Sequence, residues 1–444
     1  MCGIVGFTGN RQAAPILLDG LSKLEYRGYD SAGLAVRDGD ALAQVVKAKG
    51  RLSNLVEKTD NGNALKGTCG IGHTRWATHG EPSQINAHPH VSGNCSRSGS
   101  GAVESEVVGV HNGIIENYTE LKEKLLKHGY TFYSQTDTEV AIKLVDYYYK
   151  KYKLGPIDAI AKTMVRIRGS YALELMFRDY PDEIIAARKS SPLVVGIGAD
   201  EFFLASDATP IVEYTDKVVY LEDGEIAVLH LGKELKVVNL SNVEMTPEIK
   251  KVELNLGQLE KGGYPHFMLK EIFEQPDCIH DCMRGRINVE ADNVVLSAVI
   301  DHREKLLNAK RFIIVACGTS WHAGLIGKHL IESFCRIPVE VEYASEFRYR
   351  DPVIDGQDVV IAISQSGETA DTLAAVELAK SRGAFIYGIC NAIGSSIPRA
   401  THTGSYIHVG PEIGVASTKA FTGQVTVFAS ERNTLSYALV DDSI

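Results

Sequence analysis

Three absences narrow the kinds of protein that this 444-residue sequence can encode. It has no run of about 18 apolar residues, so we expect no segment that spans a membrane. It has no excess of basic residues: 46 Lys and Arg stand against 56 Asp and Glu, and the net charge of −10 argues against a general nucleic-acid-binding role. Its first 20 residues contain Arg11 and Asp19 and lack the apolar core of a signal peptide.

Cysteine is also sparse, and its placement favours a reducing compartment. The eight cysteines are scattered without the density of a disulfide scaffold, so reduced thiols in a cytoplasmic protein are the simplest account. Cys278 and Cys282 lack a second ligand pair, and the four histidines between residues 73 and 90 form no HExxH pattern. We therefore expect no metal site.

The order of expected strands and helices divides the chain into two halves. In the first, runs of short strands flank two helices, the second with Asp137 or Thr138 as its N-cap, which predicts an antiparallel-sheet sandwich with helices on it over residues 1–240. Residues 241–290 are charged and mostly helical in pattern, and we interpret them as a linker. Strand and helix then alternate at βαβ spacing, which predicts a parallel sheet with helices on both faces over residues 291–430.

The first stretch, MCGIVGF, places a thiol where it can become the N-terminus of the chain. Once Met1 is removed, Cys2 carries both a nucleophile and an amine base. An α-amino group titrates at about pH 7.7–8.0, so it can take the proton from the adjacent thiol near neutral pH. This is the arrangement of an N-terminal-nucleophile enzyme.

Polar residues near the expected strand ends supply the other parts of an amide hydrolase. Asn112 and the N–H of Gly113 offer two donors for an oxyanion hole. Arg75 gives a bidentate fork for the carboxylate of an amino-acid substrate, and Asp137 gives an acid for its ammonium group. Each residue alone also fits a structural role, a surface ion pair for Arg75 and a helix cap for Asp137. Together with Cys2 they supply what glutamine hydrolysis requires.

Two similar loops in the second half point to a phosphorylated ligand. CGTS and SQSGET each follow a buried strand and open a helix, where backbone N–H groups and the helix dipole attract anions. Neither loop matches GxGxxG or the P-loop pattern, so we expect no nucleotide cofactor. The hydroxyls that add donors without charge belong to Thr319, Ser320, Ser364, Ser366 and Thr369.

Several longer motifs, among them LEYRGYDSAG, GIGHTRWATHG, HNGIIENY, HFMLKEI, ACGTS, ISQSGET and EIGVASTKAFT, resemble the glutamine–fructose-6-phosphate aminotransferase family over residues 1–428. The resemblance implies an α+β N-terminal-nucleophile (Ntn) αββα sandwich, followed by flavodoxin-like α/β sugar-isomerase (SIS) domains. It implies an enzyme without a cofactor that takes L-glutamine and fructose 6-phosphate and makes glucosamine 6-phosphate. It also implies pairing of two copies through the SIS domains.

The resemblance assigns further site residues by their positions in these motifs. Cys2 is implied as the nucleophile, and Asn112 with Gly113 as the oxyanion hole. Trp76 is implied as a gate of the ammonia channel, and Arg27 as a residue that closes over the glutaminase site. The implied glutamine-binding residues are Arg75, Thr78, His79 and Asp137. The implied sugar-phosphate residues are Thr319, Ser320, Ser364, Gln365, Ser366, Thr369, Val415 and Ser417.

The end of the sequence departs from the family pattern. Residues 431–444 form a divergent tail at the place where the family continues through a second SIS domain. We therefore expect a truncated or frame-shifted product. It should keep glutamine hydrolysis and sugar-phosphate binding but be impaired in synthesis. Two alternatives stay open. One is a phosphoribosyl-pyrophosphate-type amidotransferase, although SQSGET is not its motif. The other is a glutaminase fused to a non-catalytic, sugar-phosphate-sensing SIS module.

Overall fold

The computed structural model describes residues 2–77, 79–93, 101–252, 261–288 and 293–441. The chain divides into two compact units, residues 1–256 and 257–444, and each is described by itself. Within the described residues, we find no helix that is both long and apolar enough to cross a membrane.

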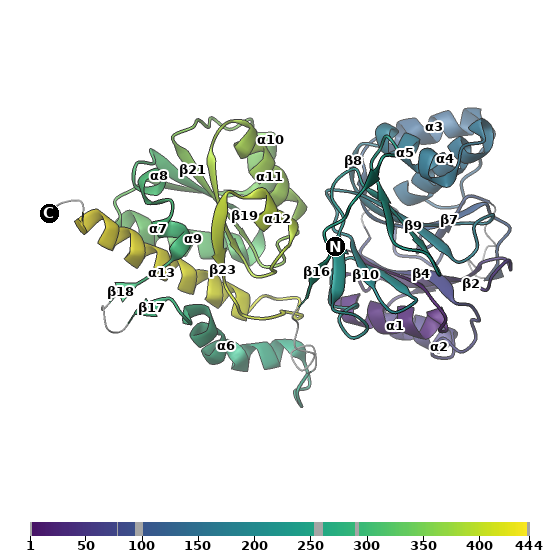
Figure 1. Ribbon diagram of the computed structural model, residues 1–444, viewed down its shortest axis with the longest axis horizontal. Helices are drawn as coiled ribbons and strands as arrows, with labels where there is room; N and C mark the ends of the chain where they lie inside the picture. The colour runs from purple at the N-terminus through teal and green to yellow at the C-terminus, as the bar shows by residue number, and fades with distance from the viewer. Residues whose placement is uncertain (1, 78, 94–100, 253–260, 289–292, 442–444) are drawn as a thin grey trace. The chain divides into compact units, whose positions relative to one another are not determined.

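The first unit is a sandwich of two antiparallel sheets with helices on its two outer faces (Figure 1). One sheet has the order β16 (Lys250–Lys251), β12 (Lys217–Tyr220), β10 (Val194–Ile197), β11 (Phe202–Ala205), β1 (Gly3–Thr8), β4 (Cys69–Arg75), β2 (Ser31–Arg37), β3 (Gln44–Lys49) and β6 (Gly101–Ala102). The other has the order β15 (Glu244–Met245), β14 (Lys236–Val238), β13 (Ile226–His230), β9 (Glu183–Lys189), β8 (Gly169–Phe177), β7 (Val107–Ile115) and β5 (His90–Val91). The helices are α1 (Ala13–Leu24), α2 (Leu52–Lys58), α3 (Tyr118–Lys127), α4 (Asp137–Tyr152) and α5 (Pro156–Arg166), with a 3₁₀ turn at Glu25–Arg27.

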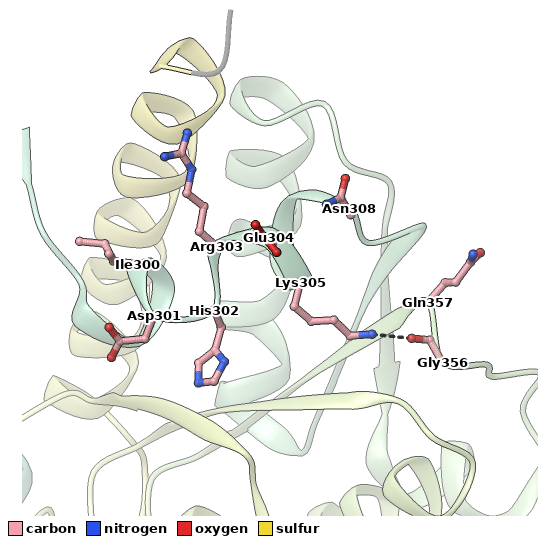
Figure 2. A pocket seen from close by; sticks show the side chains of 9 residues that line it. All are labelled: Ile300, Asp301, His302, Arg303, Glu304, Lys305, Asn308, Gly356 and Gln357. Atoms are coloured by element: carbon pink, nitrogen blue, oxygen red, sulfur yellow. Dashed lines mark hydrogen bonds between the residues drawn. The ribbon is translucent and has the colours of Figure 1, made fainter.

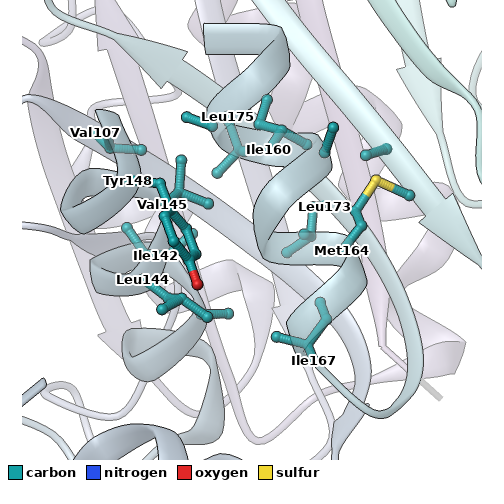
Figure 3. Packing of buried hydrophobic residues seen from close by; sticks show 14 of the residues in the cluster. Val107, Ile142, Leu144, Val145, Tyr148, Ile160, Met164, Ile167, Leu173 and Leu175 are labelled. Atoms are coloured by element: carbon teal, nitrogen blue, oxygen red, sulfur yellow. The ribbon is translucent and has the colours of Figure 1, made fainter. Parts of the chain in front are cut away.

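Alternating side chains on the strands build three hydrophobic layers. On β1, Ile4 points into the layer between the sheets, whereas Val5 and Phe7 point toward α1 and α2. The third layer lies between the other sheet and α3, α4 and α5, where Leu173 and Leu175 pack among helix residues (Figure 3). Because β1 is buried on both faces, its sequence is a continuous apolar run with no alternation of polar residues. The predicted αββα sandwich is confirmed.

The second unit is built on a five-stranded parallel sheet. Its order is β20 (Val339–Tyr343), β19 (Arg311–Ala316), β21 (Asp358–Ser364), β22 (Phe385–Cys390) and β23 (Thr403–Tyr406), the flavodoxin-like order 2-1-3-4-5. Alternate residues of β19 serve opposite faces: Phe312 and Ile314 pack with α13, and Ile313 and Val315 with α10 and α11. The helices are α6 (Phe267–Met283), α7 (Ser297–Ile300), α8 (Arg303–Leu307), α9 (Gly318–Phe334), α10 (Ala344–Tyr349), α11 (Ala370–Ser381), α12 (Ser396–Ala400) and α13 (Lys419–Asp441), with a small ribbon of β17 (Ile287–Asn288) and β18 (Asn293–Val294). The predicted parallel sheet with helices on both faces is confirmed.

Two helices of this unit lie in segments that the sequence marks as linker and tail. α6 falls in the predicted linker and packs against α13, with Cys278 and Cys282 in the same buried cluster as Phe428. α13 continues as a helix past Phe428 to Asp441, and it buries the carboxyl group of Glu431. Helical conformation therefore extends beyond the point where the apolar pattern stops.

Candidate functional site: a thiol, a carboxamide and a guanidinium

Cys2 stands directly before β1, the central strand of the nine-stranded sheet. Its Sγ accepts a hydrogen bond from Trp76 N at 3.3 Å and lies 3.5 Å from the Trp76 carbonyl oxygen. Burial raises the pKa of the Cys2 thiol, and the hydrogen bond at Trp76 and the positive charge of Arg75 offset only part of that effect. The thiol is therefore protonated at neutral pH and needs a base before it can act as a nucleophile.

The carboxamide of Asn112, on β7, is held in one orientation beside Cys2. Its Nδ2 donates to the Cys2 carbonyl oxygen at 3.0 Å and to Ser206 Oγ at 2.9 Å. Its Oδ1 lies 3.0 Å from His73 Nε2, which is also 3.1 Å from the His111 carbonyl oxygen. A carbonyl only accepts, so His73 Nε2 carries the proton and the Asn112 oxygen faces it. The NH₂ group is thereby turned toward Cys2.

Gly113 follows Asn112 and has a backbone conformation that favours glycine. Its φ is +129°, and a Cβ placed there would come within 2.0 Å of the Ser170 carbonyl oxygen on the neighbouring strand β8. The strand can pass this point only without a side chain. The sequence pattern HNG therefore has a structural reason at its glycine as well as a chemical one at its asparagine.

Arg75, the last residue of β4, is buried, and its two terminal nitrogens differ in their partners among the described residues. Its Nη2 donates to the carbonyl oxygens of His79 and Gly80, the latter at 3.0 Å. Its Nη1 is buried and has no hydrogen-bond partner among the described residues. Burial lowers the pKa of Arg75, and the charges of Asp30 and Asp137 oppose that effect. A buried guanidinium nitrogen without a partner is suited to receive a carboxylate oxygen.

The Asp137 carboxylate is placed by one backbone group at the end of β7 and one at the start of α4. Its Oδ2 accepts from Ile115 N at 2.8 Å and its Oδ1 from Thr138 N at 3.0 Å. The N-cap of α4 is Thr136, whose side chain accepts from Glu139 N. The prediction that Asp137 or Thr138 caps this helix is therefore wrong: Thr136 has the extended backbone of a cap, which leaves Asp137 as the first helical residue.

The other implied residues of this half lie around the same strand ends. Trp76 is 43% exposed, and its ring meets the Tyr29 ring edge-on with 5.4 Å between the ring centroids. The His79 ring meets Tyr118 edge-on at 5.0 Å. Arg27 is buried, with Nη2 2.6 Å from Asp207 Oδ2. Thr78 lies outside the described residues.

The predicted hydroxyl residues of the second unit gather at the carboxyl ends of β19 and β21, which are neighbours in the sheet. Ser320 Oγ accepts from Gln424 Nε2 at 3.0 Å, and Thr319 beside it is exposed on the first turn of α9. Ser364 Oγ is 3.0 Å from Thr369 Oγ1 at the start of α11. In a sheet of this order, the gap between these two strands is the switch point where ligands bind.

Backbone packing fixes the second of these loops. Gly367 has a φ of +66°, and a Cβ there would come within 1.8 Å of Ser395 Oγ. Its N–H donates to Ser364 Oγ at 3.0 Å, and Ser366 Oγ accepts from Glu368 N at 3.2 Å. Gln365 lies half-buried between these two serines. Hydrogen bonds within the loop, from backbone N–H groups to its own serine hydroxyls, therefore fix the conformation of the loop.

Val415 and Ser417 lie on a third segment, between β23 and α13. Two carboxylates of the same unit accept hydrogen bonds from backbone N–H groups in and beside this segment. Glu271 on α6 accepts from Ile413 N at 2.6 Å and Gly414 N at 2.9 Å. Glu412 accepts from the backbone N–H groups of residues 418 and 420 at 2.8 and 3.0 Å. Val415 is 69% exposed at the tip of this segment. The helix inside the predicted linker therefore anchors a predicted site loop.

Comparisons with known proteins identify the family of this chain. A glutamine amidotransferase domain model matches residues 100–213, and a SIS domain model matches residues 305–430. The chain is 74% identical over 427 residues to the glutamine–fructose-6-phosphate aminotransferase [isomerizing] of Bacteroides thetaiotaomicron, an alignment that covers 96% of this chain and 68% of that protein. The chain belongs to the glutamine–fructose-6-phosphate aminotransferase family. This confirms the resemblance drawn from the motifs and sets aside the phosphoribosyl-pyrophosphate type.

Other family members align over the same share. The protein of the same name from Chlorobaculum tepidum is 54% identical over 430 residues, covering 96% of this chain and 68% of that protein. Among solved structures, the C-terminal domain of the Francisella tularensis aminotransferase is 39% identical, covers 41% of this chain and 52% of that chain, and has a TM-score of 0.38. The 444-residue chain spans about two thirds of the length of the curated relatives that it matches.

A surface hollow of the second unit lies away from the predicted family site. Its volume is about 780 Å³, and it is lined by residues of α7 and α8 and by the turn that precedes β21, including His302, Lys305 and Gly356 (Figure 2). Lys305 Nζ donates to the Gly356 carbonyl oxygen at 2.7 Å. These residues precede β19 and β21, so the hollow is at the amino ends of the strands, opposite to the Ser and Thr loops.

Sequence reasoning missed three residues that hold the family's predicted glutaminase site. His73 and Ser206 orient Asn112, and Asp30 accepts from Ala77 N at 2.5 Å. His73 and Asp30 lie within the quoted motifs GIGHTRWATHG and LEYRGYDSAG, whereas Ser206 lies in no quoted motif. Burial lowers the pKa of His73 to about 3, so its ring is neutral. No group of three or more His, Cys, Asp or Glu residues suited to a metal ion is found in the part of the chain that the structure describes.

Proposed function

We propose that this chain hydrolyses L-glutamine at Cys2 and supplies the ammonia for making glucosamine 6-phosphate from fructose 6-phosphate. The observation that carries the glutaminase proposal is the buried Nη1 of Arg75, which has no hydrogen-bond partner among the described residues. Arg75 is followed by Trp76, whose N–H donates to the Cys2 thiol. An α-amino acid would place its carboxylate on Arg75 and its ammonium group near Asp137. Its side-chain amide would then face Cys2 and the NH₂ group of Asn112.

The proposed reaction uses the amine and thiol of a single residue. After removal of Met1, the Cys2 amine takes the thiol proton, and the thiolate attacks the carboxamide carbon of glutamine. The oxyanion that forms accepts hydrogen bonds from Gly113 N–H and from the Asn112 Nδ2 hydrogen that is held by the Cys2 carbonyl oxygen before substrate binds. The amine returns its proton to the leaving nitrogen, ammonia departs, and water cleaves the thioester to release glutamate. Arg27 is proposed to close over this chemistry and Trp76 to gate the ammonia channel, and Thr78 and His79 are proposed to help bind the glutamine.

The proposed sugar-phosphate site lies at the carboxyl ends of β19 and β21. Neutral hydroxyls and the first N–H groups of α9 and α11 supply donors for a phosphate without a charged side chain. The residues proposed to contact the sugar phosphate are Thr319, Ser320, Ser364, Gln365, Ser366, Thr369, Val415 and Ser417. We also propose that two copies of the chain pair through this unit.

A paired assay tests the proposal on the purified chain, whose mass is measured first to verify that Met1 is absent. Glutamate and glucosamine 6-phosphate are followed together with both substrates present. We expect glutamate release that Cys2→Ala abolishes, and titration heat with fructose 6-phosphate that unphosphorylated fructose does not give. Glutamate release by Cys2→Ala would overturn the mechanism. Sugar-phosphate binding without amino-sugar formation would limit the second unit of this chain to binding.

A further inference from the structure

Ser206 is a fully buried residue that joins the two halves of the proposed glutaminase site. It follows β11, and its Oγ accepts from Ile4 N at 2.9 Å and from Asn112 Nδ2 at 2.9 Å. Its own N–H donates to the Ile4 carbonyl oxygen at 3.2 Å. A hydroxyl oxygen has two lone pairs, and both are used here. The Ser206 Oγ atom therefore links β1, the strand that directly follows Cys2, to the carboxamide of Asn112.

The bond to Ser206 sets the direction of the second hydrogen of the Asn112 amide. The two hydrogens of a planar NH₂ group diverge at about 120°, so fixing one on Ser206 aims the other. That second hydrogen is the one given to the Cys2 carbonyl oxygen at 3.0 Å. His73 Nε2 holds the opposite end of the same carboxamide. The donor proposed for the oxyanion is thus aimed at the nucleophilic residue before substrate binds.

We infer that Ser206 is a positioning residue for glutamine hydrolysis, which acts by aiming the Asn112 carboxamide and by fixing the strand behind Cys2. The inference rests on the proposed glutaminase function and extends it to a residue outside the quoted motifs. The next residue, Asp207, pairs with Arg27 at 2.6 Å, so the same turn also reaches the residue proposed to close over the site.

A double-mutant cycle tests this role. Ser206→Ala is expected to lower kcat for glutamate release on the order of 10-fold to 100-fold, since a displacement of about 1 Å in a catalytic group has an effect of that size. KM for glutamine is expected to stay within about twofold, because Arg75 and Asp137 are untouched. In the Asn112→Ala background, Ser206→Ala is expected to change kcat less than about threefold, because the group that it aims is already gone.

Two further variants separate positioning from loss of fold. Ser206→Thr keeps the hydroxyl and is expected to recover most of kcat. Ser105 is the matched control: it is a buried serine whose Oγ accepts from the backbone N–H groups of Ser92 and Gly93 at 2.9 and 3.0 Å. Ser105→Ala is expected to lower the unfolding temperature and leave kcat unchanged. Equal losses of kcat from Ser206→Ala with and without Asn112 would overturn the inference.

The outcome also distinguishes this inference from the proposed function. If the wild-type chain releases no glutamate, the glutaminase proposal fails. The role of Ser206 is then decided by a crystal structure of Ser206→Ala. In that structure the Asn112 carboxamide must rotate away from the Cys2 carbonyl oxygen. A carboxamide that keeps its orientation would refute the inference.

Discussion

Replacing Asn112 by alanine removes one donor from the proposed oxyanion hole while leaving its neighbours with other partners. His73 Nε2 keeps the His111 carbonyl oxygen at 3.1 Å, and Ser206 Oγ keeps Ile4 N at 2.9 Å. Ser206 Oγ loses one of its two donors, and the Cys2 carbonyl oxygen loses the donor that Asn112 gives it. We therefore expect the variant to fold, with a modest loss of stability.

The expected effect of Asn112→Ala lies on the rate of the chemical step. Loss of a single oxyanion donor costs on the order of 10²–10³ in kcat, or about 2.7–4 kcal/mol of transition-state stabilisation. KM for glutamine should change little, because the hydrogen bond strengthens only when charge develops on the oxygen. The assay is glutamate release at saturating and at limiting glutamine.

A matched control for Asn112→Ala is available in the other unit. The side chain of Asn391 donates to the Gly410 carbonyl oxygen at 2.6 Å and accepts from Val409 N at 3.2 Å, so Asn391→Ala also removes backbone hydrogen bonds. It should leave glutamate release unchanged. A loss of kcat of tenfold or less in Asn112→Ala would refute its role as the main oxyanion donor. A large rise in KM would assign it instead to binding of the ground state.

Two further predictions test a binding contact and a buried acid. Arg75→Lys should raise KM for glutamine about 10-fold to 100-fold and leave kcat within a few fold. One ammonium group cannot bind both the loop carbonyls and a substrate carboxylate. An unchanged KM in the glutamate assay would exclude a carboxylate at Arg75. Burial raises the pKa of Glu431 from 4.5 to about 8, so the folded chain keeps a proton that the unfolded chain releases. Its contribution to stability is full below about pH 4.5 and is lost as the pH rises through about 8, at about 1.4 kcal/mol per pH unit. Urea unfolding of the second unit should follow this slope, and Glu431→Gln should flatten it; a parallel slope in the variant would locate the titration elsewhere.

The αββα sandwich and the parallel sheet could be predicted because each rests on local periodicity. GIVGF is a continuous apolar run and became β1, which is buried on both faces. Helix α9 begins at Gly318, directly after the buried strand β19, as the change from apolar to small residues indicates. Thr136 was missed as the cap of α4 because three adjacent residues can all cap a helix, and only backbone geometry selects one.

The contacts that orient the site could not be predicted in the same way. Ser206 is 94 residues from Asn112 and 202 residues from Ile4, so no local pattern connects them. Glu271 lies on a helix that reads as linker, yet its carboxylate holds the backbone at Ile413, 142 residues later. Such bonds join segments whose neighbourhood is set by sheet order and packing.

By itself, the sequence determined the chemistry that this protein can perform, because thiol, carboxamide, guanidinium and hydroxyl groups are properties of residues. It also determined the two kinds of sheet, because strand and helix periods are local. Only the tertiary structure decided which Asn112 hydrogen faces Cys2, which buried Arg75 nitrogen has no partner among the described residues, and which serine aims the amide. Those choices depend on the distances and directions between strands that are far apart in sequence, because a hydrogen bond forms only within a narrow range of distance and angle.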